Sequence, residues 1–213
     1  MMKVHGYFRS GAAWRLRIAL NLKGIAVDEA FVHLRKREQA APAFRTLNPQ
    51  RLVPVLEHDG AVLTQSLAII EYLEEIQPHP PLLPSRPVDR AFVRAIALAI
   101  ACDIHPLDNL RVLSYLKDDF GIDDAGRDRW YAHWVAQGFT ALETMLAGDP
   151  RVGAFCFGDT PSLADICLVP QMGNAERMKC PLDAYPTLRR IRDAALELSA
   201  FALAEPDRQP DAQ

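Results

Sequence analysis

The chain has 213 residues, of which 49% are hydrophobic and 24% are charged, with a formal net charge of −3. This composition suits one large or two small globular domains. No apolar run is long enough to span a bilayer, and the N-terminus lacks the form of a secretion signal, so we expect a cytoplasmic protein. The four cysteines show neither close pairing nor metal-finger spacing, which indicates buried thiols and no metal site.

Charge is distributed unevenly along the chain. Residues 1–84 carry a small excess of Lys and Arg over Asp and Glu, whereas the remainder is acidic. No basic stripe with interleaved aromatic residues appears, so nothing favours a nucleic-acid partner. The first part could instead favour small anionic ligands.

The first part of the chain alternates strand and helix signals. Four strands and three helices are expected, the strands at 3–8, 26–32, 53–57 and 61–63, and the helices at 14–23, near 42–47 and from Ser66 to the residue before Pro78. The last two strands form a hairpin that turns at residues 58–60. The order βαβ, helix, ββα predicts a thioredoxin-like domain over residues 1–84.

After a proline-rich linker at 78–87 the strand signals stop. Long helical patterns follow and predict an all-helical domain over residues 88–213, with helices at about 88–120, 125–147, 162–179 and 185–200. Ser162 and Asp165 have the spacing of an acidic capping box, to which we assign a folding role. Residues 205–213 are polar and rich in proline, and we expect a loose tail there.

Ser10 is the first candidate functional residue, because it lies between a strand and the first turn of a helix. The free N–H groups and partial positive charge of a helix N-terminus favour a sulfur anion, and a hydroxyl donor there lowers the pKa of a thiol. Serine before a helix is more often only a cap. The segment alone leaves both interpretations open.

Two further segments of the first domain could bind a ligand. A cis peptide bond before Pro54 would leave the backbone of Val53 free to pair with a peptide, although an ordinary trans turn is the commoner form. Gln65 and Ser66 offer an amide, a hydroxyl and a helix N-terminus, which suit a carboxylate. A simple helix cap explains Ser66 equally well, but explains Gln65 less well.

The third candidate segment surrounds Pro106, inside the first long helix expected in the second domain. Proline removes a helix hydrogen bond and kinks the axis. The kink would gather His105, Asn109 and Arg111 within about a turn and a half of helix. A buried, hydrogen-bonded histidine beside a structural kink is the competing interpretation.

These segments together resemble the zeta class of the glutathione transferases, and within it the bacterial maleylacetoacetate and maleylpyruvate isomerases. The resemblance covers essentially the whole chain. It is carried by the sequences FRSG at 8–11, RLRIALNLKG at 15–24, LNPQ at 47–50, LVP at 52–54, TQSLAIIEYL at 64–73, CDIHP at 102–106 and GDTPSLAD at 158–165. Each segment alone is weak evidence for the family, but the whole set is specific to it.

The resemblance implies a glutathione site and a role for each candidate residue. Ser10 would face the glutathione sulfur, Val53 with a cis Pro54 would hold the cysteinyl backbone, and Gln65 with Ser66 would hold the γ-glutamyl end. Gln50 would reach the glycyl end. His105 and Asn109 would close the site from the helical domain, and the dicarboxylate substrate would be held by Arg9, Arg111 and Arg177.

The implied reaction is a cis–trans isomerisation without net redox change, in the breakdown of aromatic compounds. Glutathione thiolate would add to the double bond of maleylacetoacetate, allow rotation, and leave to give the trans product. Arg9 and Arg177 would fix the substrate carboxylates and stabilise the developing enolate. A homodimer is also implied.

The chain departs from the family pattern at two places. Ala12 and Ala13 stand where family members commonly have a cysteine or threonine and a serine, so two polar groups are missing beside Ser10. Leu110 stands where some maleylpyruvate isomerases have arginine, which favours maleylacetoacetate over maleylpyruvate. Three alternatives remain: a maleylpyruvate isomerase, a glutathione transferase or α-halo acid dehalogenase, and a noncatalytic glutathione-binding protein, which Ala12 and Ala13 favour.

Overall fold

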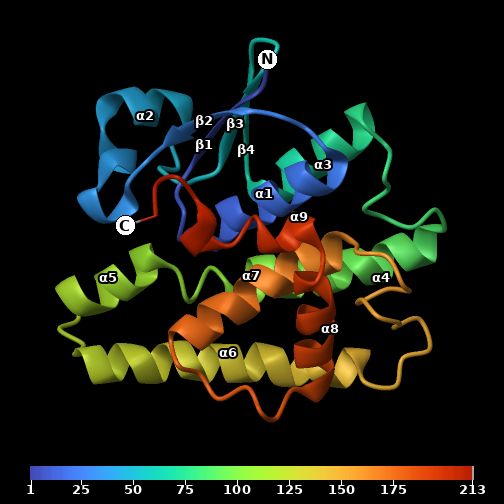
Figure 1. Ribbon diagram of the computed structural model, residues 1–213. Helices are drawn as coiled ribbons and strands as arrows, with labels where there is room; N and C mark the ends of the chain where they lie inside the picture. The colour runs from blue at the N-terminus through green and yellow to red at the C-terminus, as the bar shows by residue number, and fades with distance from the viewer. Residues whose placement is uncertain (213) are drawn as a thin grey trace. The chain divides into compact units, whose positions relative to one another are not determined.

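The computed structural model describes residues 1–212, which divide into two compact units (Figure 1). One unit contains residues 1–81 together with the segment that starts at Leu198, and the other contains residues 82–197. The domain limits expected from the sequence, 1–84 and 88–213, stay a prediction. The grouping of the C-terminal segment with the first unit was not anticipated.

A four-stranded mixed sheet organises the first unit. Its strands lie in the order β2-β1-β3-β4 and comprise β1 (Lys3–Gly6), β2 (Asp28–Phe31), β3 (Val55–His58) and β4 (Ala61–Thr64). β1 pairs in parallel with β2 and antiparallel with β3, and β3 pairs antiparallel with β4. The hairpin turns at Asp59 and Gly60, which both have positive φ, as a tight two-residue turn requires. The expected thioredoxin-like order of strands and helices is therefore confirmed.

Helices α1 (Gly11–Lys23) and α3 (Ser66–Ile76) pack against each other and supply much of the core of this unit. Their apolar faces are fully buried, with exposures of 0–1% at Leu16, Ile69, Ile70 and Leu73. The buried Lys23 at the end of α1 donates to Glu74 Oε2 and to two backbone carbonyls, so its charge is both paired and hydrogen-bonded.

A second apolar cluster forms around α2 (Pro42–Leu47), which follows the short 3-10 turns η1 (Leu34–Lys36) and η2 (Glu38–Ala40). The bounds of α2 agree with the helix expected near 42–47. Its one buried residue, Phe44, joins a cluster of buried side chains with Tyr7, Phe8, Val32, Val53 and Val55. This cluster ties the loops after β1 and before β3 to one another.

The expectation of a loose C-terminal tail is wrong. Of the predicted tail, residues 205–212 are described and Gln213 lies outside the described residues. This part contains η4 (Pro206–Arg208), and Asp211 Oδ2 accepts from the backbone N–H of Phe8 in the loop after β1. The helix before it, α9 (Ser199–Ala202), bonds to α1 through the carbonyl of Ala200. Arg17, half-buried on α1, donates to the carbonyl of Ala204. The prediction failed because it used only the polar, proline-containing composition of the segment. Composition does not reveal hydrogen-bond partners that lie some 200 residues earlier in the chain.

The second unit is helical, as expected, and is built around one buried helix. It comprises α4 (Pro87–Leu98), the π-helical segment η3 (Ala99–Ile104), α5 (Leu110–Asp118), α6 (Asp124–Leu146), α7 (Leu163–Arg177) and α8 (Pro186–Leu196). Twelve of the fifteen residues of α7 are buried. α7 packs against α4, η3 and α8. Within residues 1–212 no helix has the length and apolar character needed to cross a membrane.

The single helix expected over 88–120 is interrupted in the structure. α4 passes into the π-helical segment η3, and a turn then separates η3 from α5. Pro106 lies in this turn, where its missing N–H and its ring prevent continuation of the helix. Asn109 starts the next helix, because its Oδ1 accepts from the N–H groups of Arg111 and Val112.

The capping box expected at the start of α7 is confirmed. Asp165 Oδ2 accepts from both the backbone N–H and the hydroxyl of Ser162, each at 2.8 Å, and Asp165 Oδ1 accepts from the backbone N–H of Cys156 at 2.8 Å. The carboxylate is completely buried. It therefore connects the loop before α7 to the first turn of that helix.

Asp165→Ala is expected to lower the free energy of unfolding by about 3 kcal/mol, because it leaves the buried N–H groups of Cys156 and Ser162 without an acceptor. Urea unfolding measures the change. Asp118→Ala, which removes an exposed carboxylate from the end of α5, is the matched control and should change stability by less than about 0.5 kcal/mol. Equal effects of the two substitutions would contradict this account.

Asp108 predicts a pH-dependent stability. Burial raises its pKa from 3.8 to about 8. Burial also raises the pKa values of Tyr131 and Cys180, and the charge of the ionised Asp108 adds to both shifts. Between the ordinary pKa and about 8 the native state holds a proton that the unfolded chain has released, so stability falls as the pH rises through this range.

We expect Asp108→Asn to flatten this profile and to be more stable than wild type by about 2 kcal/mol near pH 9. Urea unfolding of both proteins between about pH 5 and pH 9 measures the difference. Asp103→Asn, at an exposed position of η3, should leave the profile unchanged. Parallel profiles for wild type and Asp108→Asn would rule out a raised pKa at this carboxyl group.

Candidate active site

The register of the sheet brings three of the predicted segments to one edge. His5 of β1 is opposite Val55 of β3, and Val55 is opposite Thr64 of β4. The residues just outside this row are therefore neighbours: the turn that follows β1 and contains Ser10, the Val53–Pro54 peptide before β3, and the Gln65–Ser66 pair after β4. Segments more than 40 residues apart in sequence meet here.

Ser10 is the N-cap of α1, as the sequence suggested. Its Oγ accepts from the backbone N–H of Ala13 at 3.2 Å, and its own N–H donates to the carbonyl of Tyr7 at 2.9 Å. Because the hydroxyl acts as an acceptor within the cap, its proton is available to a further acceptor. The first turn of α1 contains no acidic residue that would oppose an anion at this helix end.

Ala12 and Ala13 both lie in the first turn of α1, beside Ser10. Their methyl groups add no hydrogen-bond donor or acceptor. The polar groups that this turn offers to an anion are therefore the Ser10 hydroxyl and the backbone N–H groups of the helix N-terminus.

The peptide bond between Val53 and Pro54 is cis, so the ordinary trans turn is excluded. Val53 lies before β3, outside the ladder that begins at Val55, and its side chain is buried in the cluster around Phe44. Its backbone N–H and C=O are thus not used by the pairing of the sheet. This is the arrangement in which an extended peptide can add its own backbone hydrogen bonds.

Gln50 and Gln65 lie side by side, since Gln65 Nε2 donates to Gln50 Oε1 at 2.9 Å. Both side chains are exposed. Gln65 occupies the N-cap position of α3, with a φ of 69° and no side-chain capping bond, and Ser66 is the first residue of the helix. The interpretation of Ser66 as a simple N-cap is therefore wrong, and the N-terminus of α3 carries an amide and a hydroxyl that its own capping does not use.

Asn48 is a buried organiser of this edge that the sequence analysis did not single out. Its Nδ2 donates to the carbonyl of Leu52 at 2.8 Å, and its Oδ1 accepts from the N–H of Gln50 at 3.0 Å. These bonds fold the loop that precedes the cis proline. The Asn48-Pro49 dipeptide, which favours a turn, was the available signal in the sequence.

Arg9 lies directly before Ser10 and is half-buried. Its guanidinium carbon is 4.9 Å from the centroid of the Phe8 ring, a cation–π contact. Arg9 therefore places a fixed positive charge in the same turn as Ser10.

The other predicted residues belong to the second unit. His105 follows the π-helical segment η3 as its C-cap, and Asn109 caps α5 with its side chain. Arg111 in the first turn of α5 and Arg177 at the C-terminal end of α7 are both exposed. The functional roles of these four residues stay predictions. Across residues 1–212 no group of three or more His, Cys, Asp and Glu is arranged to hold a metal ion.

Comparison with known proteins agrees with this geometry. The family model for the N-terminal domain of the glutathione S-transferases matches residues 9–76, and the model for their C-terminal domain matches residues 124–201. A maleylpyruvate isomerase of Ralstonia is 50% identical over 210 residues, which cover 99% of both chains.

Two solved structures are similar over the full length. A maleylpyruvate isomerase described as a bacterial glutathione S-transferase of the zeta class superposes with a TM-score of 0.97 at 49% identity, covering 99% of this chain and 100% of the other. A maleylacetoacetate isomerase from Methylobacterium extorquens AM1, solved with bound malonate and glutathione, gives a TM-score of 0.96 at 43% identity over 99% of each chain. This chain therefore belongs to the glutathione S-transferase family and, within it, to the zeta class.

Proposed function

We propose that this protein is a glutathione-dependent cis–trans isomerase of maleylacetoacetate or of the closely similar maleylpyruvate. The observation that carries the proposal is the meeting of Ser10, the cis Val53–Pro54 peptide and the Gln65–Ser66 pair at one edge of the sheet. The names of the full-length relatives support the same reaction class.

The residues at this edge fit the three parts of glutathione. The unpaired backbone of Val53 suits the cysteinyl residue in an extended conformation. The N-terminus of α3, with Ser66 and the Gln65 amide, suits the γ-glutamyl carboxylate, because helix N-termini favour anions. We assign the glycyl end to Gln50, which accepts a hydrogen bond from the Gln65 amide.

Glutathione, when bound, supplies a thiolate whose reversible addition to the substrate double bond permits rotation and returns the thiol unchanged. The Ser10 hydroxyl would donate a hydrogen bond to the sulfur while keeping its proton, and the N-terminus of α1 would add its partial positive charge. Both interactions favour the thiolate over the thiol. Ala12 and Ala13 provide no further donor, so the activation depends on Ser10 and the helix end.

Recognition of a dicarboxylate requires positive charge. Arg9 is fixed beside Ser10, where it can bind a substrate carboxylate and stabilise the negative charge that develops during addition. Arg111 and Arg177 are the further candidates for substrate binding. The bound malonate in the Methylobacterium relative, a small dicarboxylate, supports this substrate class.

An activity assay with both substrates decides between maleylacetoacetate and maleylpyruvate. Leu110 favours maleylacetoacetate, whereas the Ralstonia relative at 50% identity is a maleylpyruvate isomerase. A cytoplasmic location and a homodimer complete the proposal and are supported by the resemblance to the family.

Ser10→Ala is expected to lower kcat/KM for isomerisation by about 100-fold, because it removes a hydrogen bond to the charge that reacts. The measurement is glutathione-dependent isomerisation of maleylacetoacetate and of maleylpyruvate, with quantification of the glutathione that remains. Ser10→Thr, which keeps a hydroxyl, should retain more activity than Ser10→Ala. Ser85→Ala, at an exposed position of the second unit, should match wild type.

Each alternative function gives different products, which are measured with the two maleyl substrates and, in a separate assay, with an α-halo acid. Consumption of glutathione with formation of a thioether would indicate a transferase, and release of halide from an α-halo acid would indicate a dehalogenase. Glutathione binding with no turnover of either maleyl substrate would reject the isomerase and leave a binding protein.

A further inference from the structure

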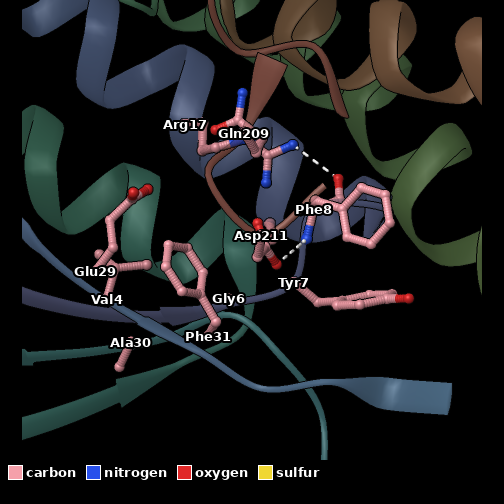
Figure 2. A pocket seen from close by; sticks show the side chains of 11 residues that line it. Val4, Gly6, Tyr7, Phe8, Arg17, Glu29, Ala30, Phe31, Gln209 and Asp211 are labelled. Carbon is pink, nitrogen blue, oxygen red and sulfur yellow. Dashed lines mark hydrogen bonds between the residues drawn. The ribbon is translucent and has the colours of Figure 1, made fainter. Parts of the chain in front are cut away.

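One contact of the C-terminal segment with the rest of the first unit surrounds the peptide groups of Phe8 (Figure 2). Asp211 Oδ2 accepts from the backbone N–H of Phe8 at 3.0 Å. Arg17 Nη2 donates to the backbone carbonyl of Phe8 at 3.0 Å, while Arg17 Nε donates to the carbonyl of Ala204 at 3.1 Å. Arg17 thus links α1, the loop after β1 and the C-terminal segment.

The residue held in this way lies in the turn that presents Ser10. The N–H of Ser10 donates to the carbonyl of Tyr7, which closes the turn around Phe8. Both backbone polar groups of Phe8 are bonded from outside the turn, by Asp211 and by Arg17. The conformation of the turn is therefore set by the C-terminal segment as well as by its own hydrogen bond.

Burial and charge strengthen these contacts. Burial lowers the pKa of Arg17 to about 10, and the charges of Asp211 and Glu29 oppose this shift, so Arg17 stays protonated near neutral pH. A charged donor and a charged acceptor form stronger hydrogen bonds than neutral ones. Asp211 bonds to the backbone N–H of Phe8, and Arg17 bonds to its carbonyl.

The segment is also held in its own conformation. Gln209 Nε2 donates to the carbonyls of Leu203 and Glu205. Ala212 packs against the apolar cluster that contains Tyr7 and Val53, which are two of the residues that flank the candidate site. Gln209 and Asp211 of the segment line a small pocket together with residues of β1, β2 and α1 (Figure 2).

From these contacts we propose that Asp211 and Arg17 are positioning residues for catalysis, through which the C-terminal segment holds the Phe8 turn and so fixes the hydroxyl of Ser10 at the N-terminus of α1. The proposal rests on the function proposed above, because it concerns the same hydroxyl. A catalytic group that is displaced by a fraction of an ångström loses much of its effect, whereas binding of distant parts of the ligand is little changed.

The test compares Asp211→Ala with Asp207→Ala, which removes an exposed carboxylate from the same segment. Asp211→Ala is expected to lower kcat by about 10-fold with little change in the KM for glutathione, since the groups that hold the γ-glutamyl and glycyl ends are untouched. Asp207→Ala should match wild type. Asp211→Asn should recover most of the lost kcat, because its amide oxygen can accept from the Phe8 N–H.

Amide hydrogen exchange of the substrate-free protein provides a second readout. Exchange in the segment from Phe8 to Ala13 should be faster in Asp211→Ala than in wild type, while exchange in α7 should be unchanged. This pattern distinguishes a local loss of the turn from general destabilisation.

The results separate failure of this inference from failure of the proposed function. Wild-type kcat in Asp211→Ala, or an equal loss in Asp207→Ala, would overturn the positioning role while leaving the isomerase intact. A uniform rise in exchange throughout the first unit would also overturn it, because the effect would then be one of stability. Absence of isomerisation by the wild-type protein would reject the proposed function and the positioning role together.

Discussion

The pairing of β3 between β1 and β4 is the constraint on which the candidate site depends. Because His5, Val55 and Thr64 lie in one row across the sheet, the segments that follow or precede them must meet at the same edge. Two helices, α1 and α3, begin there, and their N-termini both favour negative charge. A ligand with a thiolate and a carboxylate is complementary to this pair of helix ends.

The local features of this edge could be predicted from the sequence because each has a short-range signature. The strands of the first unit, the hairpin at Asp59 and Gly60 and the helix from Ser66 follow from patterns within a few residues. The same holds for the capping box at Asp165 in the second unit. The cis peptide at Pro54 did not follow from the residues alone, since trans is the commoner form. It was expected only from the family resemblance.

Features that depend on long-range contacts were missed or misread. The C-terminal segment was expected to be loose because its composition is polar, but Asp211 bonds to a peptide N–H more than 200 residues earlier in the chain. Asn48 appeared only as part of a motif, although it organises the loop before Pro54. The interruption between α4 and α5 exceeded the kink expected from Pro106, because periodicity does not distinguish a bent helix from two helices.

The central claim is that the helix end at Ser10 stabilises a glutathione thiolate without help from residues 12 and 13. The most direct test is a pH titration of the ultraviolet thiolate absorbance of glutathione bound to wild type and to Ser10→Ala. The account predicts that the thiol pKa of bound glutathione lies well below its value in free solution, and that the Ser10→Ala substitution moves it back toward that value. A bound thiol with the pKa of free glutathione in the wild-type protein would contradict the account.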